Sequence, residues 1–194
     1  MSTVSDRERW NRKYANATGE PTMPARVLVD YEHLLPDDGQ VLEIACGLGG
    51  NALWLAERGL TVEAWDVSEV ALARLQAEAD RRGVTVQTTR RDVHTQPPAP
   101  GGWDVIVITR FLDRSIAADI VSALRPGGLL FYQTFSRIQV GTGGPRNPAF
   151  RLADGELLAL FAALGPVVYR EEGVIGDTAR GFRNQAMLIA RRGD

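Results

Sequence analysis

The 194-residue chain predicts one α/β domain with a mostly parallel sheet of about seven strands, helices on both faces and an antiparallel hairpin at one edge. Three observations predict it. Short apolar segments alternate with segments of helical spacing, glycine and proline separate the segments, and the last two apolar segments have no helix between them. The length fits a single domain spanning 1–194, since domains commonly have about 100–200 residues.

Strands are expected where short apolar runs end at glycine, proline or polar residues. The very apolar fourth run, Asp104–Thr109, is expected to be buried on both faces, as central parallel strands are. The expected strands are Val41–Ala45, Thr61–Trp65, Val84–Thr88, Asp104–Thr109, Leu129–Phe135, Val167–Glu172 and Asn184–Ala190.

Helices are expected between these strands. Ser68 is a good N-cap for the second helix, Gly83 ends it, and Asp154 can cap the last one. The third helix should end at the turn 125–128. The expected helices are Asn51–Arg58, Val70–Arg82, Ile116–Leu124 and Glu156–Leu164.

Composition excludes several classes of protein. The 22 Lys and Arg against 24 Asp and Glu give a net charge of -2, so we expect no nucleic-acid partner. No apolar run approaches the ~20 residues of a membrane span, and because the N-terminus is polar and charged we expect no signal peptide. The lone Cys46 forms no internal disulfide, which favours the cytoplasm. We also expect no metal site and a monomer or weak homodimer.

The strongest local signal is the segment from Val41 to Ala52, where a strand ends in small residues and a helix begins. Gly47 and Gly49 let the main chain approach a ligand with no Cβ in the way. The N-terminus of the following helix offers free N–H groups to an acceptor. These features indicate a nucleotide-type ligand, and the alternative is a tight turn without a ligand.

Two acidic residues follow at the ends of the next two strands. Asp66 lies about twenty residues after the glycines, where an acid accepts hydrogen bonds from ribose hydroxyls. The alternative for Asp66 is a helix cap. Asp92 can accept a hydrogen bond from an adenine amino group while Val93 packs on the ring. The alternative for Asp92 is a surface acid paired with a neighbouring arginine.

The glycine spacing also fits a dinucleotide fingerprint, Gly47-x-Gly49-x-x-Ala52, so an NAD-type oxidoreductase is a rival. Glu43 opposes it, because a simple dinucleotide site expects an apolar residue inside that strand. The aromatic and charged segment before the motif and the expected absence of a second substrate domain oppose it too.

The run Glu43-x-Ala45-Cys46-Gly47-x-Gly49 resembles the first motif of class I S-adenosylmethionine-dependent methyltransferases. Asp66, Asp92, the fourth strand and the turn 125–128 fall where later motifs of that family fall, so the resemblance covers nearly the whole chain. Ala45 stands where glycine is commoner. Trp10-Asn11-x-x-Tyr14, the run 45–56 and the loop 144–150 are similar to the tellurite-resistance methyltransferase group.

The resemblance implies a Rossmann-like fold, S-adenosylmethionine as cofactor, S-adenosylhomocysteine as product and a small-molecule acceptor such as a thiol or chalcogen oxyanion. It names no catalytic residue, and a thiolate or oxyanion needs no general base. The third possibility is a module that binds S-adenosylmethionine without catalysis. The implied cofactor-binding residues are Glu43, Ala45, Cys46, Gly47, Gly49, Asn51, Asp66, Val67, Asp92, Val93 and Thr109.

The acceptor is expected at four candidate residues, Trp10, Tyr14, Arg110 and Arg146. Trp10 and Tyr14 are one helical turn apart and share a face, so segment 1–38 forms either a helical lid or a helix packed on the sheet. Arg110 ends the fourth strand, where ligands bind in open α/β sheets. Arg146 lies in the candidate substrate loop 137–152.

Overall fold

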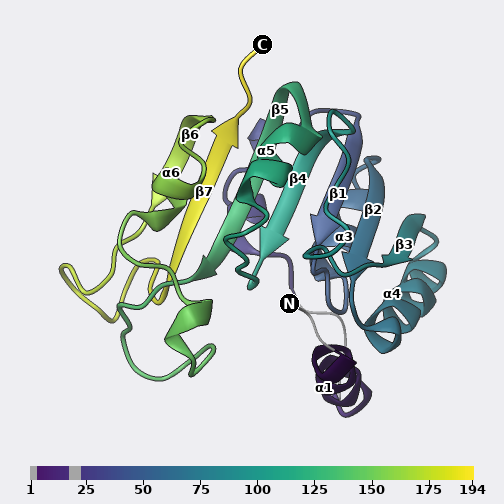
Figure 1. Ribbon diagram of the computed structural model, residues 1–194, viewed down its shortest axis with the longest axis horizontal. Coiled ribbons are helices and arrows are strands. Elements are labelled where there is room, and N and C mark those ends of the chain that lie inside the picture. Colours follow the sequence, from purple (N-terminus) through teal and green to yellow (C-terminus); the bar gives the residue numbers. More distant parts are fainter. Residues whose placement is uncertain (1–3, 18–22) are drawn as a thin grey trace.

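The computed structural model describes residues 4–17 and 23–194, which form a seven-stranded sheet with helices on both faces (Figure 1). The strand order is β3-β2-β1-β4-β5-β7-β6. The first five strands in this order are parallel neighbours, and β7 is antiparallel to both β5 and β6. The predicted fold class is therefore confirmed. The strands are β1 (Gln40–Ile44), β2 (Thr61–Asp66), β3 (Val86–Arg90), β4 (Trp103–Thr109), β5 (Leu124–Phe135), β6 (Gly165–Arg170) and β7 (Gln185–Arg191).

Helices cover the two faces with separate hydrophobic clusters. One cluster packs α2, α3 and α4 on the sheet, and the other packs α5 and α6. No helix in the described ranges is long and apolar enough to cross a membrane. The helices are α1 (Val4–Ala15), α2 (Arg26–Val29), α3 (Gly50–Ala56), α4 (Glu69–Arg82), α5 (Ala117–Ala123) and α6 (Glu156–Leu160), with 3-10 turns η1 (Glu32–Leu34) and η2 (Pro148–Phe150).

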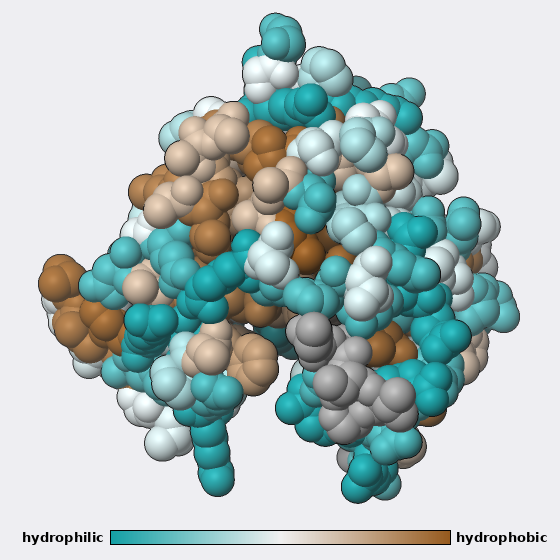
Figure 2. Space-filling model, in the orientation of Figure 1, coloured by the Kyte–Doolittle hydropathy of each residue, from teal (hydrophilic) through white to brown (hydrophobic). Residues whose placement is uncertain are grey.

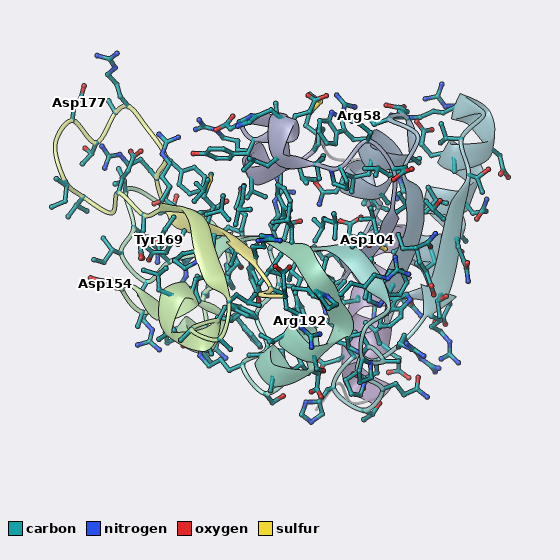
Figure 3. All side chains as sticks on the ribbon, turned by 90° about the horizontal axis from the view of Figure 1, so that it is seen from above. Arg58, Asp104, Asp154, Tyr169, Asp177 and Arg192 are labelled. Atoms are coloured by element: carbon teal, nitrogen blue, oxygen red, sulfur yellow. The ribbon has the colours of Figure 1, made fainter. Side chains whose placement is uncertain are left out.

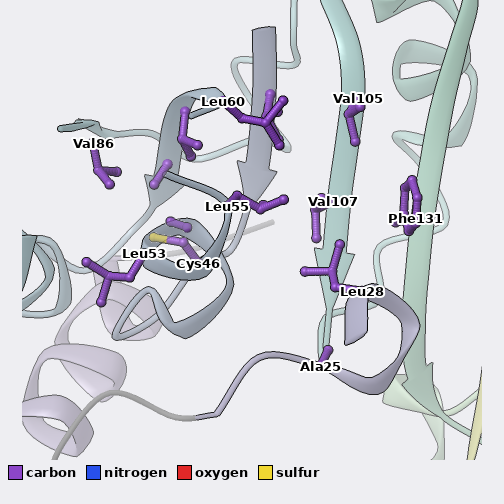
Figure 4. Packing of buried hydrophobic residues seen from close by; sticks show 14 of the residues in the cluster. Ala25, Leu28, Cys46, Leu53, Leu55, Leu60, Val86, Val105, Val107 and Phe131 are labelled. Atoms are coloured by element: carbon purple, nitrogen blue, oxygen red, sulfur yellow. The ribbon is translucent and has the colours of Figure 1, made fainter. Parts of the chain in front are cut away.

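The centre of the sheet is buried on both faces. In β4, Val105 and Val107 belong to the first cluster, while Ile106 and Ile108 belong to the second. All four are 0% exposed, as the apolar run predicts. Figure 4 shows the first cluster, with Leu28 of α2 packed beside Val107.

The third strand begins two residues later than predicted, at Val86 rather than Val84. Gly83 takes the left-handed conformation at the end of α4 (φ 69°), and the Val84 N–H donates to the Ala79 carbonyl at 3.1 Å. Val84 is therefore part of the helix cap and is not available to the sheet.

The predicted turn 125–128 lies inside β5 as an irregularity. Trp103 pairs with Leu124 and Val105 pairs with Leu129, so the segment 125–128 bulges opposite Asp104. Gly128 packs there so closely that a Cβ would lie 3.1 Å from the Trp103 carbonyl oxygen. The fifth strand therefore begins at Leu124 and not at Leu129.

Asp154 is not the cap of α6, contrary to the prediction. Gly155 is the N-cap in the left-handed conformation (φ 70°), without a side-chain cap. Glu156 instead accepts the Ala153 N–H through Oε2 at 2.6 Å. The helix also ends at Leu160, four residues before the expected end. The remaining predicted ends differ by about two residues or fewer.

The carboxyl ends of the parallel strands meet at one edge of the sheet. In Figure 1 this edge points toward α1 and toward the loop that follows β5. α2 is fixed there because the Val27 N–H donates to Gln133 Oε1 of β5 at 2.8 Å. Both N-terminal helices therefore lie at the edge where the predicted site residues end their strands.

Candidate functional site

A glycine turn follows β1 and begins the site. Ala45 and Gly47 both have φ 55°, and Gly49 has φ 75° and caps α3. A Cβ on Gly47 would lie 2.7 Å from the Tyr14 hydroxyl oxygen, and one on Gly49 would lie 2.2 Å from Leu75 Cδ1. Glycine is therefore required at both positions. Ala45 is strained in this conformation, as residues at ligand sites often are.

Asp66 lies at the end of β2, directly beside this turn. Its carboxylate accepts the Gly47 N–H and the Ser68 N–H, each at 2.8 Å. The side chain is 6% exposed, and burial raises its pKa while these hydrogen bonds oppose the rise. Ser68 itself caps α4 by accepting the Ala71 N–H at 3.2 Å. Asp66 therefore joins the glycine turn to the second strand.

Glu43 is 1% exposed and lies beneath the turn. Its Oε1 accepts a hydrogen bond from Asn51 Nδ2 at 2.7 Å, whereas Oε2 has no partner among the described residues. Burial raises the pKa of Glu43 to about 8, although the bond from Asn51 opposes this. A buried carboxylate oxygen without a partner is costly, so it points to a missing donor or cation.

Asn51 connects four parts of the chain. Its Oδ1 accepts the Ala25 N–H at 2.8 Å, and its Nδ2 donates to Glu43 Oε1 and to Thr109 Oγ1, the latter at 2.9 Å. Both atoms of the side-chain amide thus have protein partners. Asn51 and Thr109, two of the predicted cofactor residues, hold the ends of β1 and β4 together.

Cys46 contributes main chain to the site. Its side chain is 7% exposed and packs in the first hydrophobic cluster near Leu53 (Figure 4). Its N–H donates to the Trp65 carbonyl at 3.0 Å, which fixes the turn to β2. Burial is the main cause of the raised pKa of the thiol. The Cys46 side chain is therefore a core residue.

The segment after β3 lies beside Asp66, because the Arg91 N–H donates to the Asp66 carbonyl at 3.0 Å. Asp92 follows, and its Oδ1 accepts the His94 N–H at 3.1 Å. Within residues 4–17 and 23–194, Asp92 makes no ion pair with a neighbouring arginine. Val93 is 7% exposed and packs in the second hydrophobic cluster. Asp66, Asp92 and the glycine turn are thus at one edge.

A second strained residue, Arg110, directly follows β4. Arg110 has φ 55°, like Ala45 at the end of the neighbouring β1, and its N–H donates to the Gln133 carbonyl at 2.9 Å. The Arg110 side chain is exposed. Its charge adds to burial and Arg9 in lowering the pKa of Lys13, and it opposes the raised pKa that burial gives Tyr14, which places Arg110 on the side of the edge where α1 lies.

Helix α1 is docked on α4. Asn11 Oδ1 accepts the Ser68 hydroxyl at 2.6 Å, and Asn11 Nδ2 donates to Glu69 Oε1 at 2.9 Å. The rings of Trp10 and Tyr14 stack with centroids 5.6 Å apart. Burial, followed by the charge of Asp66, raises the pKa of Tyr14 far above its ordinary value. Tyr14 thus lies over the glycine turn.

Lys13 belongs to this group, although the sequence did not single it out. Its Nζ lies 4.2 Å from the centroid of the Trp10 ring. Burial, Arg9 and Arg110 all lower the pKa of Lys13, in that order. Helical spacing predicts the pairing of Lys13 with Arg9. Nothing in the sequence predicts the proximity to Arg110, which depends on how α1 docks.

The loop after β5 carries Arg146, which is exposed. Figure 2 shows a notch at the lower edge of the molecule, between the lobe that contains this loop and the side where α1 lies. None of the described contacts joins Arg146 to Arg110. The two candidate acceptor residues therefore come from different elements along the same edge.

Residues 41–128 match a protein family described as a methyltransferase domain. The chain is 32% identical over 160 residues to an uncharacterized protein of Mycobacterium tuberculosis, covering 77% of this chain and 57% of that one. It is 29% identical over 183 residues to the thiopurine S-methyltransferase of Pseudomonas fluorescens, covering 79% of each. The crystal structure of TehB from Haemophilus influenzae superposes with a TM-score of 0.68 at 22% identity, covering 96% of this chain and 66% of that one.

The chain spans between half and two thirds of the length of the mycobacterial protein that it matches. The match to the methyltransferase domain covers β1 to the bulge in β5, and so includes the glycine turn, Asp66 and Asp92.

Proposed function

We propose that the chain is a class I S-adenosylmethionine-dependent methyltransferase and that it transfers the methyl group of S-adenosylmethionine to a small-molecule acceptor. One observation carries the proposal. Two buried carboxyl groups meet the segment 45–51 at the carboxyl edge of the sheet: Asp66 accepts the Gly47 N–H, and Glu43 accepts the amide of Asn51.

The residues at this edge fit the cofactor. The unpartnered Oε2 of Glu43 suits the ammonium group of the methionine part, because that charge would satisfy a buried acceptor. Asp66 would accept the ribose hydroxyls, as acids at the end of the second strand do. Asp92 and Val93 would hold the adenine together with Val67. Gly47 and Gly49 would offer main chain to the methionine part.

The cofactor supplies a methyl group that is already electrophilic because it is bound to a sulfonium. The protein then has to hold the acceptor in line and exclude water, and such positioning is worth roughly 7–11 kcal/mol. Tyr14 and Trp10 form the lid in this proposal, since Tyr14 already lies over the glycine turn.

The acceptor is an anion in this proposal. Lys13 and Arg110 gather at the edge, and neither makes an ion pair with a carboxylate in the part of the chain that the structure describes. Their positive potential favours a thiolate or a chalcogen oxyanion over a neutral acceptor. The similarity to a thiopurine S-methyltransferase is compatible with a sulfur nucleophile. Arg146 would contribute charge from the opposite side.

The net charge of -2 argues against nucleic acid as the acceptor, because the chain as a whole has no excess of positive charge to attract phosphates. We place the reaction in the cytoplasm, where the single buried Cys46 stays reduced. A monomer or weak homodimer suffices, because every proposed cofactor residue comes from one chain.

The test is to incubate the protein with S-adenosylmethionine and a panel of thiols, selenite, tellurite and phenols, and to measure S-adenosylhomocysteine. Turnover of a thiol or chalcogen oxyanion is expected. Binding of S-adenosylmethionine without turnover of any acceptor would favour the non-catalytic module. Preferential binding of NAD in parallel titrations would favour the oxidoreductase and overturn the proposal.

A further inference from the structure

The loop 137–152 leaves the carboxyl end of β5 and returns to it. The Arg137 N–H donates to the Leu152 carbonyl, and the Leu152 N–H donates to the Phe135 carbonyl, each at 2.8 Å. These two bonds close the loop at its base. Its far part, including Arg146, is exposed. A closed loop with an exposed tip needs internal contacts if it is to keep one shape.

Arg151 supplies those contacts. Its side chain donates to the carbonyl oxygens of Ser136 at 2.9 Å and Pro145 at 2.7 Å, and also to that of Gly143. The residue is only 4% exposed, and it makes no ion pair with a carboxylate among the described residues. The guanidinium fork thus takes the place of a hydrophobic core inside the loop.

Arg114 ties this loop to the segment that follows β4. It lies four residues after Arg110, and it donates to the carbonyl oxygens of Ala149 at 2.7 Å and Arg151 at 3.0 Å. It also binds both carboxylate oxygens of Glu156, at 2.5 and 3.0 Å. This pairing is the main cause of the lowered pKa of Glu156. One side chain therefore joins three segments.

We propose that Arg114 is a positioning residue for the methyl acceptor, because it holds the loop that carries Arg146 at a fixed place relative to Arg110. The inference rests on the proposed function. Arg110 lies in the segment after β4, and Arg146 lies in the loop after β5. The Arg114 side chain bonds that segment to that loop. The notch in Figure 2 lies beside this loop.

The chain provides a matched control at the opposite edge of the sheet. Arg192, directly after β7, fixes the start of β5 by the same chemistry, donating to the carbonyl oxygens of Ser122 at 2.8 Å and of Leu124. Leu124 pairs with Trp103, the first residue of β4, so these bonds lie at the amino ends of the parallel strands. Figure 3 looks onto this edge from above, and Arg192 and Asp104 are labelled there near the middle of the molecule. Arg192→Gln therefore loosens a segment on the side of the sheet away from the proposed acceptor.

The experiment compares Arg114→Gln with Arg192→Gln in the whole chain, using the acceptor from the panel that the wild type methylates fastest. In Arg114→Gln the KM for that acceptor should rise about tenfold and kcat should fall, with S-adenosylhomocysteine affinity within about twofold. Hydrogen exchange should quicken in 137–152. Arg192→Gln should quicken exchange in 117–128 and leave both kinetic constants unchanged.

Arg114→Lys keeps the positive charge but loses the forked guanidinium group. Its KM for the acceptor should therefore stay close to that of Arg114→Gln and well above that of the wild type. Unchanged acceptor kinetics in Arg114→Gln, or an equal loss of cofactor affinity, would overturn the inference alone. Equal kinetic losses in Arg192→Gln would do the same. No turnover of any acceptor by the wild type would instead overturn the proposed function, and this inference with it.

Discussion

At the scale of single residues, the carboxyl groups of Glu43 and Asp66 differ in how far the protein satisfies them. Asp66 accepts two main-chain N–H groups, whereas Glu43 keeps one buried oxygen without a described partner. Burial raises the pKa of Glu43 to about 8, so the cofactor-free protein holds this carboxyl largely protonated at neutral pH. A cationic ligand group beside it would favour the ionised form.

Glu43 should therefore make the stability of the cofactor-free protein depend on pH. Its folded pKa of about 8 lies above its unfolded value, so its contribution to the free energy of unfolding is full below the unfolded pKa. That contribution is lost as the pH rises from about 4 through 8. Urea unfolding from pH 5 to 9 should show wild-type stability falling relative to Glu43→Gln. Parallel pH profiles for the two proteins would contradict this.

Asp66→Ala should weaken the binding of S-adenosylhomocysteine by about 1–3 kcal/mol, the usual cost of losing a buried polar partner. Isothermal titration calorimetry measures the change, and Asp38→Ala, at an exposed position before β1, is the control. Wild-type affinity in Asp66→Ala would mean that Asp66 only fixes the glycine turn.

Some residues of the site can be predicted from the sequence, and others cannot. Gly47, Gly49 and Asp66 are recognisable because a strand, a turn and a helix follow one another locally. Lys13 was not recognisable, because its relation to Arg110 depends on the docking of α1. The roles of Arg114 and Arg151 were hidden for the same reason, since their partners are main-chain carbonyls that every residue possesses.

At the scale of elements, polar contacts hold α1 on α4 at both ends of the interface. Asn11 bonds to both Ser68 and Glu69 at the start of α4, and Arg74 of α4 donates to the carbonyl oxygens of Tyr14 and Ala17, each at 2.7 Å. All four bonds are part-buried or exposed, and elements bonded in this way open more readily than core strands do. We therefore expect α1 to open more readily than the sheet.

Asn11→Ala should loosen α1, because it removes both bonds that Asn11 makes to α4, keeps those of Arg74 and leaves the Ser68 cap intact. Hydrogen exchange in residues 6–15 should quicken, and S-adenosylhomocysteine should dissociate about three to ten times faster, as the loss of one or two modest hydrogen bonds implies. Glu8→Ala, at an exposed position of the same helix, should change neither. Unaltered dissociation in Asn11→Ala would argue against a lid.

Element boundaries were predictable only where a local signal exists. Ser68 and Gly83 mark both ends of α4 because a cap is a local interaction. The bulge 125–128 was not predictable, since it depends on the pairing of β5 with β4. Asp154 was mistaken for a cap because a glycine in the left-handed conformation can end a loop without a side-chain bond.

At the scale of the whole molecule, stability depends on the doubly covered centre of the sheet. Ile106 on β4 is 0% exposed, whereas Val167 on the edge strand β6 is 47% exposed. Alternation of strands and helices along the chain predicts this layering, and the last two strands without a helix between them predict the antiparallel edge. The fold was therefore the most predictable level.

Ile106→Ala should lower the free energy of unfolding by about 2–5 kcal/mol, because it leaves a cavity between packed layers. Val167→Ala removes apolar atoms from a half-exposed edge and should cost less than about 1 kcal/mol. Chemical denaturation of both variants gives the comparison. Similar losses in the two proteins would mean that the edge strand is buried in solution.

The amide of Asn51 has a consequence for how this sequence can change over evolution. Ala25, Glu43 and Thr109 all bond to that one side chain. A substitution at position 51 therefore leaves a donor or an acceptor without its partner in three distant segments at once. Positions 43, 51 and 109 should accordingly vary together among relatives. A library randomised at all three should return functional clones as matched sets, while single replacements at position 51 disappear under selection.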